Sequence, residues 1–143
     1  MRIIAKKWLA ILLLWPCLGG AQNVTEETRE RVFTASFDYY FLHEFCAALD
    51  PTLSADSLRH KMQEDVGKIL QLNKQNADMF VGDFISSYTE LVSDNDEYGQ
   101  AMSYRIEQFN NINNSVKQES CLSMKQGRSK QFQEALKLLK SEL

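Results

Sequence analysis

The chain has 143 residues, with 19 acidic side chains against 16 basic ones and a formal net charge of −3. This length suits one domain rather than two. The acidic balance argues against a nucleic-acid partner, because phosphates require a basic binding face.

The first 21 residues carry the pattern of a secretory signal peptide. Arg2, Lys6 and Lys7 form a basic start without acids, an apolar run follows over residues 8–18, and small residues lead to Ala21. This order is typical of cleaved export signals. The apolar run is too short for a membrane-spanning helix, which needs about 20 residues. We therefore expect cleavage after Ala21, no stable membrane anchor afterwards, and a location in the periplasm or outside the cell.

Cysteine usage predicts one disulfide in the mature chain, residues 22–143, which we expect to form a single helical domain. Cys17 leaves with the signal, so Cys46 and Cys121 remain. Two cysteines in an oxidising compartment have a single intramolecular pairing. On the chain-entropy model such a bridge stabilises by roughly 4 kcal/mol, less if strained. Two free thiols and an intermolecular bond are the alternatives.

Charge is distributed unevenly along the mature chain. Loss of the three basic residues of the signal leaves 13 bases and 19 acids, a net charge of −6. Residues 22–116 carry a net charge of −9, and residues 117–143 carry +3. The favoured interpretation is that the basic tail packs against the acidic body. The alternative is a polarised surface that steers a charged partner.

Apolar residues follow helical spacing through almost the whole mature chain. Asn23 and Glu26 form a capping-box pattern, which predicts a first helix that runs to about Leu49. The Asp50–Pro51 pair stops it. A second helix is expected from near Ser54.

Three further helices are expected after a break at residues 73–76. The third extends over residues 77–92, with the clearest apolar stripe of the chain. Asp94 is expected to cap a fourth helix that ends near Ser120, and Ile112 and Val116 belong to its apolar stripe. Gly127 marks a turn, after which Ser129 caps a fifth helix.

Short connections between successive helices favour an antiparallel arrangement. The sequence therefore predicts an all-α, compact bundle of about four to five helices with one disulfide. Cys46 and Cys121 would lie at opposite ends of such a bundle. The bridge thus requires a break, a crossing angle or an extended link before Cys121.

The first helix supplies the candidate binding residues because it is apolar on nearly all sides. Such a helix is usually central. The alternative is an exposed second face that contacts a partner, formed by Tyr39 and Leu42 with the adjacent His43 and Glu44. Glu44 falls inside the apolar arc, where a carboxylate needs a partner or a raised pKa. A hydrogen bond or salt bridge within the bundle is favoured over a ligand contact.

Patterns for catalysis and for bound cofactors are weak or incomplete. Residues 94–99 resemble the start of a calcium loop, but Arg105 stands where a bidentate glutamate is required. His43 and Cys46 are spaced as metal ligands, yet a structural zinc site needs four. The sequence contains no nucleophile elbow, phosphate-binding glycine loop or zinc-protease motif. We therefore expect no catalytic residues, no cofactor and no metal.

The leading hypothesis is an exported, non-enzymatic protein-binding module that binds another envelope or secreted protein. An immunity or inhibitor protein and a secretion or assembly helper are two such roles. This rests on analogy of architecture, and a fold does not fix a function. A carrier of small apolar ligands and an acid-stress chaperone are the alternatives.

Overall fold

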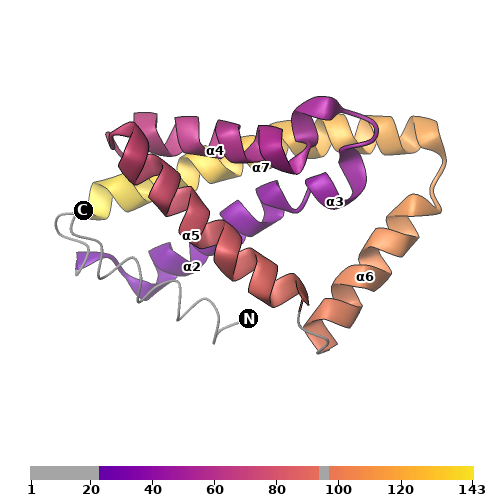
Figure 1. Ribbon diagram of the computed structural model, residues 1–143, viewed down its shortest axis with the longest axis horizontal. Helices are drawn as coiled ribbons and strands as arrows, with labels where there is room; N and C mark the ends of the chain where they lie inside the picture. The colour runs from indigo at the N-terminus through magenta and orange to yellow at the C-terminus, as the bar shows by residue number, and fades with distance from the viewer. Residues whose placement is uncertain (1–22, 94–96) are drawn as a thin grey trace.

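The computed structural model describes residues 23–93 and 97–143, which form helices and no strands (Figure 1). The elements in order are α2 (Glu26–Tyr40), α3 (His43–Cys46), the 3₁₀ turn η2 (Pro51–Leu53), α4 (Ala55–Ile69), α5 (Lys74–Ser93), α6 (Glu97–Asn110) and α7 (Asn114–Glu142). The predicted all-α bundle with one disulfide is confirmed. The predicted signal peptide and the predicted helix cap at Asp94 fall outside the described residues.

Helices α2 and α7 form an antiparallel pair with the most extensive contact in the fold. At one end, the Glu142 carboxylate accepts hydrogen bonds from the Thr25 backbone N–H at 2.9 Å and from the Thr28 hydroxyl. A carboxylate there satisfies N–H groups at the start of α2 and complements its dipole. At the other end, the disulfide joins Cys46 to Cys121.

Helices α4 and α5 form a second pair, joined by a short turn. Ser54 caps α4, because its hydroxyl accepts the Ser57 backbone N–H. At the opposite end Gln71 adopts a φ of +57°. This left-handed residue brings the Leu72 N–H to the Gly67 carbonyl at 3.0 Å, which is the usual way to end a helix, although glycine is the usual residue.

Helix α2 is central, as the favoured interpretation of its composition predicts. Phe33 packs edge-on against Phe84 of α5, with ring centroids 5.9 Å apart. On the other side Tyr39 packs against Phe132 of α7, at 5.8 Å. Large apolar side chains on both sides of one helix are therefore buried together in one core.

The predicted boundaries of the first helix are wrong at both ends. Thr25, not Asn23, is the N-cap, since its hydroxyl accepts the Thr28 N–H at 3.2 Å. The helix also kinks at Phe41 and Leu42 before the short helix α3. Leu42 donates to the Tyr39 carbonyl three residues back, which tightens the chain locally.

The predicted division between the fourth and fifth helices is also wrong. The break lies at residues 111–113, where the Asn113 side chain accepts the Ser115 N–H and caps α7. Gly127 and Ser129, expected to form a turn and a cap, lie inside α7, which has 29 residues. This break provides the change of direction that the disulfide requires, because it places Cys121 in the first half of α7 beside α3.

Helix α6 has few contacts with the rest of the described chain, and Figure 1 shows it extending away from the α2–α7 pair. Met102 is its buried anchor. The Phe109 ring also packs against Phe45 of α3, with centroids 4.5 Å apart. The outer face of α6 is largely exposed.

Candidate functional site

The kink between α2 and α3 places His43 over a free backbone carbonyl. In a regular helix the Glu44 N–H would bond to the Tyr40 carbonyl, but here it bonds to the Phe41 carbonyl at 3.0 Å. The His43 ring instead donates from Nδ1 to the Tyr40 carbonyl at 2.5 Å. The imidazole thus satisfies an acceptor that the kink releases.

Glu44 finds its partners within the bundle, as the favoured interpretation predicts. The Tyr88 hydroxyl of α5 donates to Oε1 at 2.9 Å, and His43 Nε2 lies 3.3 Å from the same oxygen. The hydrogen bond from His43 lowers the pKa of Glu44, and that from Tyr88 acts in the same direction, against the opposing effect of burial.

Tyr39 and Leu42 do not form the exposed face that the sequence suggested. They are 3% and 1% exposed, respectively. Leu42 is enclosed in the core, while the edge of Tyr39 reaches the floor of a surface groove. Burial raises the pKa of the Tyr39 hydroxyl, and a hydrogen bond with Ser129 partly opposes this. The alternative interpretation, an exposed second face formed by Tyr39 and Leu42, is therefore wrong.

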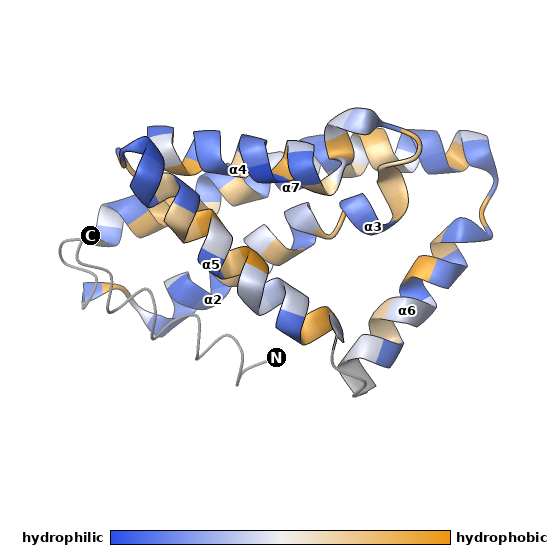
Figure 2. Ribbon diagram, viewed as in Figure 1, coloured by the Kyte–Doolittle hydropathy of each residue, from blue (hydrophilic) through white to orange (hydrophobic). Residues whose placement is uncertain are grey.

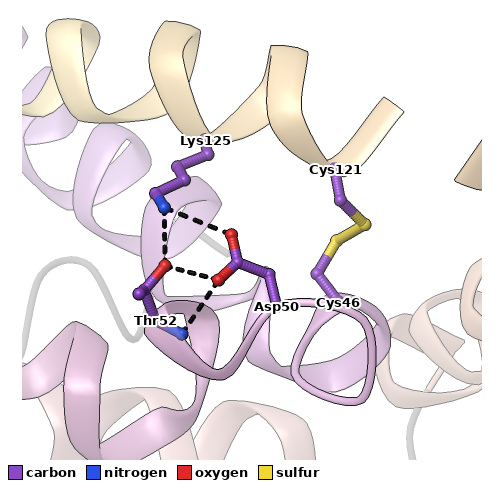
Figure 3. Close-up of a disulfide and its surroundings, with 5 residues drawn as sticks. All are labelled: Cys46, Asp50, Thr52, Cys121 and Lys125. Carbon is purple, nitrogen blue, oxygen red and sulfur yellow. Dashed lines mark hydrogen bonds and ion pairs between the residues drawn. A yellow bond between two sulfur atoms is a disulfide. The ribbon is translucent and has the colours of Figure 1, made fainter. Parts of the chain in front are cut away.

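A polar cluster lies beside the disulfide and ties α7 to η2 (Figure 3). The Lys125 ammonium group lies 3.2 Å from an oxygen of Asp50 and donates to the Thr52 hydroxyl at 2.6 Å. Asp50 also accepts the Thr52 backbone N–H at 3.0 Å. The hydrogen bonds from Thr52 and Lys125 lower the pKa of Asp50. Cys46, Asp50 and Lys125 thus hold one end of the bundle together.

The basic tail pairs with the acidic body at a second point. Arg128 Nη1 lies 2.7 Å from Oδ2 of Asp38 on α2. Burial nevertheless raises the pKa of Asp38, because the loss of hydration outweighs the attraction of Arg128. These contacts support the interpretation in which the tail packs against the acidic body.

Two open grooves flank α7 and differ in charge. The groove between α2 and α7 has a volume of about 610 Å³, and its lining includes Glu27, Glu30, Asp38 and Glu134. The groove between α4 and α7 has a volume of about 630 Å³ and no carboxylate in its lining. We call the second the basic groove, after three lining lysines: Lys61, Lys125 and Lys130.

Exposed large apolar side chains are concentrated, along the sequence, on the second half of α6, the following turn and the first part of α7. Five such side chains occur among the residues the structure describes, and four of them lie between positions 104 and 122. These four, which we call the apolar corner, are Tyr104, Ile112, Val116 and Leu122. The fifth is Met79 of α5. Figure 2 shows hydrophobic segments at the turn between α6 and α7.

Sequence reasoning missed the apolar corner because it assigned Ile112 and Val116 to the buried stripe of one long helix. They are 42% and 48% exposed. The break at residues 111–113 changes the helix axis, so the spacing no longer places them with Met102 and Phe109. The four asparagines at 110, 111, 113 and 114 were the signal that could have revealed the turn.

Within residues 23–93 and 97–143, no group of three or more histidine, cysteine, aspartate or glutamate side chains is arranged to hold a metal ion. Over the same ranges, none of the helices combines the length and the apolar character needed to cross a membrane.

Comparisons with known proteins add no assignment. No family model matches the chain, and no curated protein or solved structure is similar to it.

Proposed function

We propose that the chain is an exported, non-enzymatic protein-binding module whose partner covers the apolar corner. The observation that carries the proposal is the concentration of exposed apolar side chains at positions 104–122. Scattered exposed apolar residues are normal on a protein surface, whereas a local concentration is typical of an interaction site. Tyr104, which is 60% exposed, is of the residue types that often dominate interface energies.

The polar clusters are engaged in holding the bundle together, which favours binding over catalysis. Glu44 accepts a hydrogen bond from the Tyr88 hydroxyl. Asp50 accepts hydrogen bonds from the Lys125 ammonium group and from the Thr52 backbone N–H. These pairs join different helices and resemble the internal hydrogen bonds of a scaffold. Most of the residues that line the two open grooves beside α7 carry polar or charged groups.

Export is the second part of the proposal, and it rests on the signal-peptide pattern of residues 1–21. The buried core of the described chain starts at Val24, so cleavage after Ala21 would keep all of it. The Cys46–Cys121 bridge is compatible with an oxidising compartment. Cell fractionation and N-terminal sequencing of the recovered protein test this part directly. A cytoplasmic protein with an intact Met1 end contradicts it.

The binding part is tested by affinity capture. Tagged residues 22–143, with the disulfide intact, are incubated with envelope and secreted fractions of the source cells, and captured proteins are identified by mass spectrometry. We expect one stoichiometric partner. The triple variant Tyr104→Ser, Ile112→Ser, Val116→Ser should lose it, because the partner then gains no apolar burial at the corner.

The matched control is Met79→Ser, which removes an exposed apolar side chain of α5 outside the corner. It should retain the partner. Circular dichroism and the presence of the native disulfide show that each variant is folded. Equal capture by the wild type and the corner variant, or capture of no protein by either, contradicts the proposal.

A further inference from the structure

The apolar corner accounts for only part of the affinity that a specific complex needs. Its four side chains are about half exposed. Burying the remainder gives about 4 kcal/mol at the usual value for a fully buried apolar side chain, about 2 kcal/mol each. Association itself costs a similar or larger amount in lost freedom of motion. A stable complex therefore requires a second contact, and the basic groove lies next to the corner, because Leu122 belongs to both.

Three lysines from two helices supply the positive charge of the basic groove. Lys61 comes from α4, whereas Lys125 and Lys130 come from α7. Lys125 and Lys130 are five residues apart, a rise of about 7.5 Å along the helix. The positive charges are therefore spread along the groove and do not converge on one point. Such a layout suits an extended anionic chain better than a single small anion.

Lys125 is held by Asp50 and the Thr52 hydroxyl, whereas the acidic partners of Lys61 and Lys130 leave these two lysines able to bind a ligand. Lys61 lies 3.1 Å from Asp65, whose side chain is only 6% exposed. Lys130 lies 4.0 Å from Glu134, beyond hydrogen-bonding distance, and its side chain is 77% exposed. An ammonium group carries three N–H donors. Asp50, Asp65 and Glu134 are not among the residues that line the basic groove, although Asp50 and Asp65 contact lining lysines. Lys130 is therefore the least closely paired of the three lysines.

The contrast with the other groove beside α7 gives selectivity. That groove presents four carboxylates against Arg31 alone. The mature chain as a whole is also acidic, with a net charge of −6. An acidic segment is therefore repelled by most of the surface and attracted to one place on it. Repulsion of an acidic segment from the rest of the surface determines where the segment binds, together with its attraction to the basic groove.

We propose that the basic groove binds an extended acidic segment of the partner protein. This inference rests on the proposed function and specifies the partner's chemistry. Carboxylates of the segment approach Lys130 and Lys61, and an apolar side chain at one end packs against Leu122. The side chains of Gln126 and Gln133 also line the groove and can bond to the backbone amides of the segment.

The test uses a fluorescein-labelled peptide with one leucine followed by alternating glutamate and serine, titrated into residues 22–143 with the disulfide intact. Fluorescence anisotropy gives the affinity. The control peptide replaces each glutamate by glutamine and should not bind. Lys130→Glu should weaken binding about tenfold, because it exchanges an attraction for a repulsion. Gln126→Glu, a second variant within the lining, should also weaken it.

Lys137→Glu is the matched control variant. It makes the same change of charge on the same helix, at an exposed residue outside the lining. It should change the affinity less than about twofold, because exposed charges beyond a Debye length are screened at physiological salt. Lys61 is kept intact because the buried Asp65 carboxylate depends on it.

Four outcomes overturn the inference. The first is an equal loss of peptide affinity in Lys130→Glu and Lys137→Glu, and the second is equal binding of the glutamine peptide. The third is displacement of the peptide by inorganic phosphate at concentrations similar to those of the peptide. The fourth is a homodimer of the free protein that the Lys130→Glu substitution dissociates. The last would make a second copy the occupant.

The experiments also distinguish failure of the basic-groove assignment from failure of the proposed function. The corner variant should retain the peptide. If affinity capture yields a partner that Lys130→Glu still binds normally, the groove assignment fails and the proposed function stands. If the peptide binds as expected and no partner is captured, the proposed function fails and the groove remains.

Discussion

Removal of the disulfide is expected to cost the protein a large part of its stability. The bridge joins Cys46 to Cys121 across a sequence separation of 75 residues. Opening a loop of this size returns about 4.5 kcal/mol of conformational entropy to the unfolded chain. Small domains are stable by only about 5–15 kcal/mol, so the loss is a substantial fraction of the total.

The variant to measure is Cys46→Ala with Cys121→Ala, compared with each single change and with the oxidised wild type. Urea unfolding should show a loss of about 4.5 kcal/mol in the double variant, and the melting temperature should fall by about 17 °C for a chain of this length. Each single variant should lose nearly as much as the double, because either change breaks the same bond. The urea dependence should also become steeper, since the unfolded chain expands.

A loss below about 1.5 kcal/mol would refute the reasoning, because it would show that the bridge does little to restrict the unfolded chain. Additive losses in the two single variants would also refute it. They would indicate that each buried half-cystine contributes through its own packing, which is a separate source of stability. The wild type measured in dithiothreitol provides a control without any substitution.

Three other changes have defined outcomes. Gly127→Ala should raise the free energy of unfolding by about 0.5–1 kcal/mol in urea titrations, because Gly127 lies inside α7 and an added Cβ meets no atom within 4 Å. A loss of stability would contradict this. Gln71→Gly should stabilise by about 1 kcal/mol, since Gln71 adopts a left-handed φ of +57° that glycine tolerates better. An unchanged midpoint would mean that Gln71 carries no strain. Glu44→Gln should cost about 1 kcal/mol at pH 7, allowing for solvent screening at this part-exposed residue. Because the folded pKa of Glu44 lies below its ordinary value of 4.5, this cost should persist above pH 4.5 and disappear as the pH falls through the folded pKa. The exposed Glu90→Gln serves as its control, and a cost independent of pH would contradict the assignment.

Local signals in the sequence predicted the structure correctly where no contact with a distant part of the chain opposed them. Helix α4 starts directly after Ser54, as expected, and the stripe of the third predicted helix is largely buried, including Phe80, Phe84 and Leu91. The disulfide followed from counting, because two cysteines allow a single pairing. In each case one short-range rule determined the structure without competition from distant contacts.

The sequence was misleading where a weak local signal met strong packing. Gly127 suggested a turn, but a glycine inside a helix costs only about 1 kcal/mol. Phe132 and Leu136, buried on the following turns, contribute more than that to keeping α7 continuous. At the α2–α3 kink, Phe41 and Leu42 carry no helix-breaking signal, so the kink could not be predicted from local sequence.

The candidate sites depend on tertiary contacts that no spacing rule supplies. Glu44 stood out in the sequence as a carboxylate in an apolar arc, but its partner Tyr88 lies 44 residues away. The basic groove exists only because α4 brings Lys61 next to Lys125 and Lys130 of α7. Such pairs require the packing of the whole bundle to be known.

The position of the disulfide links the stability of the fold to its proposed binding surface. The second half of α7 is held by its buried contacts with α2, including Phe132, and by Glu142 at the end. The first half has one deeply buried side chain, Cys121, among largely exposed neighbours. The bridge to Cys46 therefore fixes the part of α7 that carries Val116 and Leu122. If these residues bind a partner, reduction should weaken binding at denaturant concentrations where helical content is still intact, because the corner loses its anchor before the α2–α7 core unfolds.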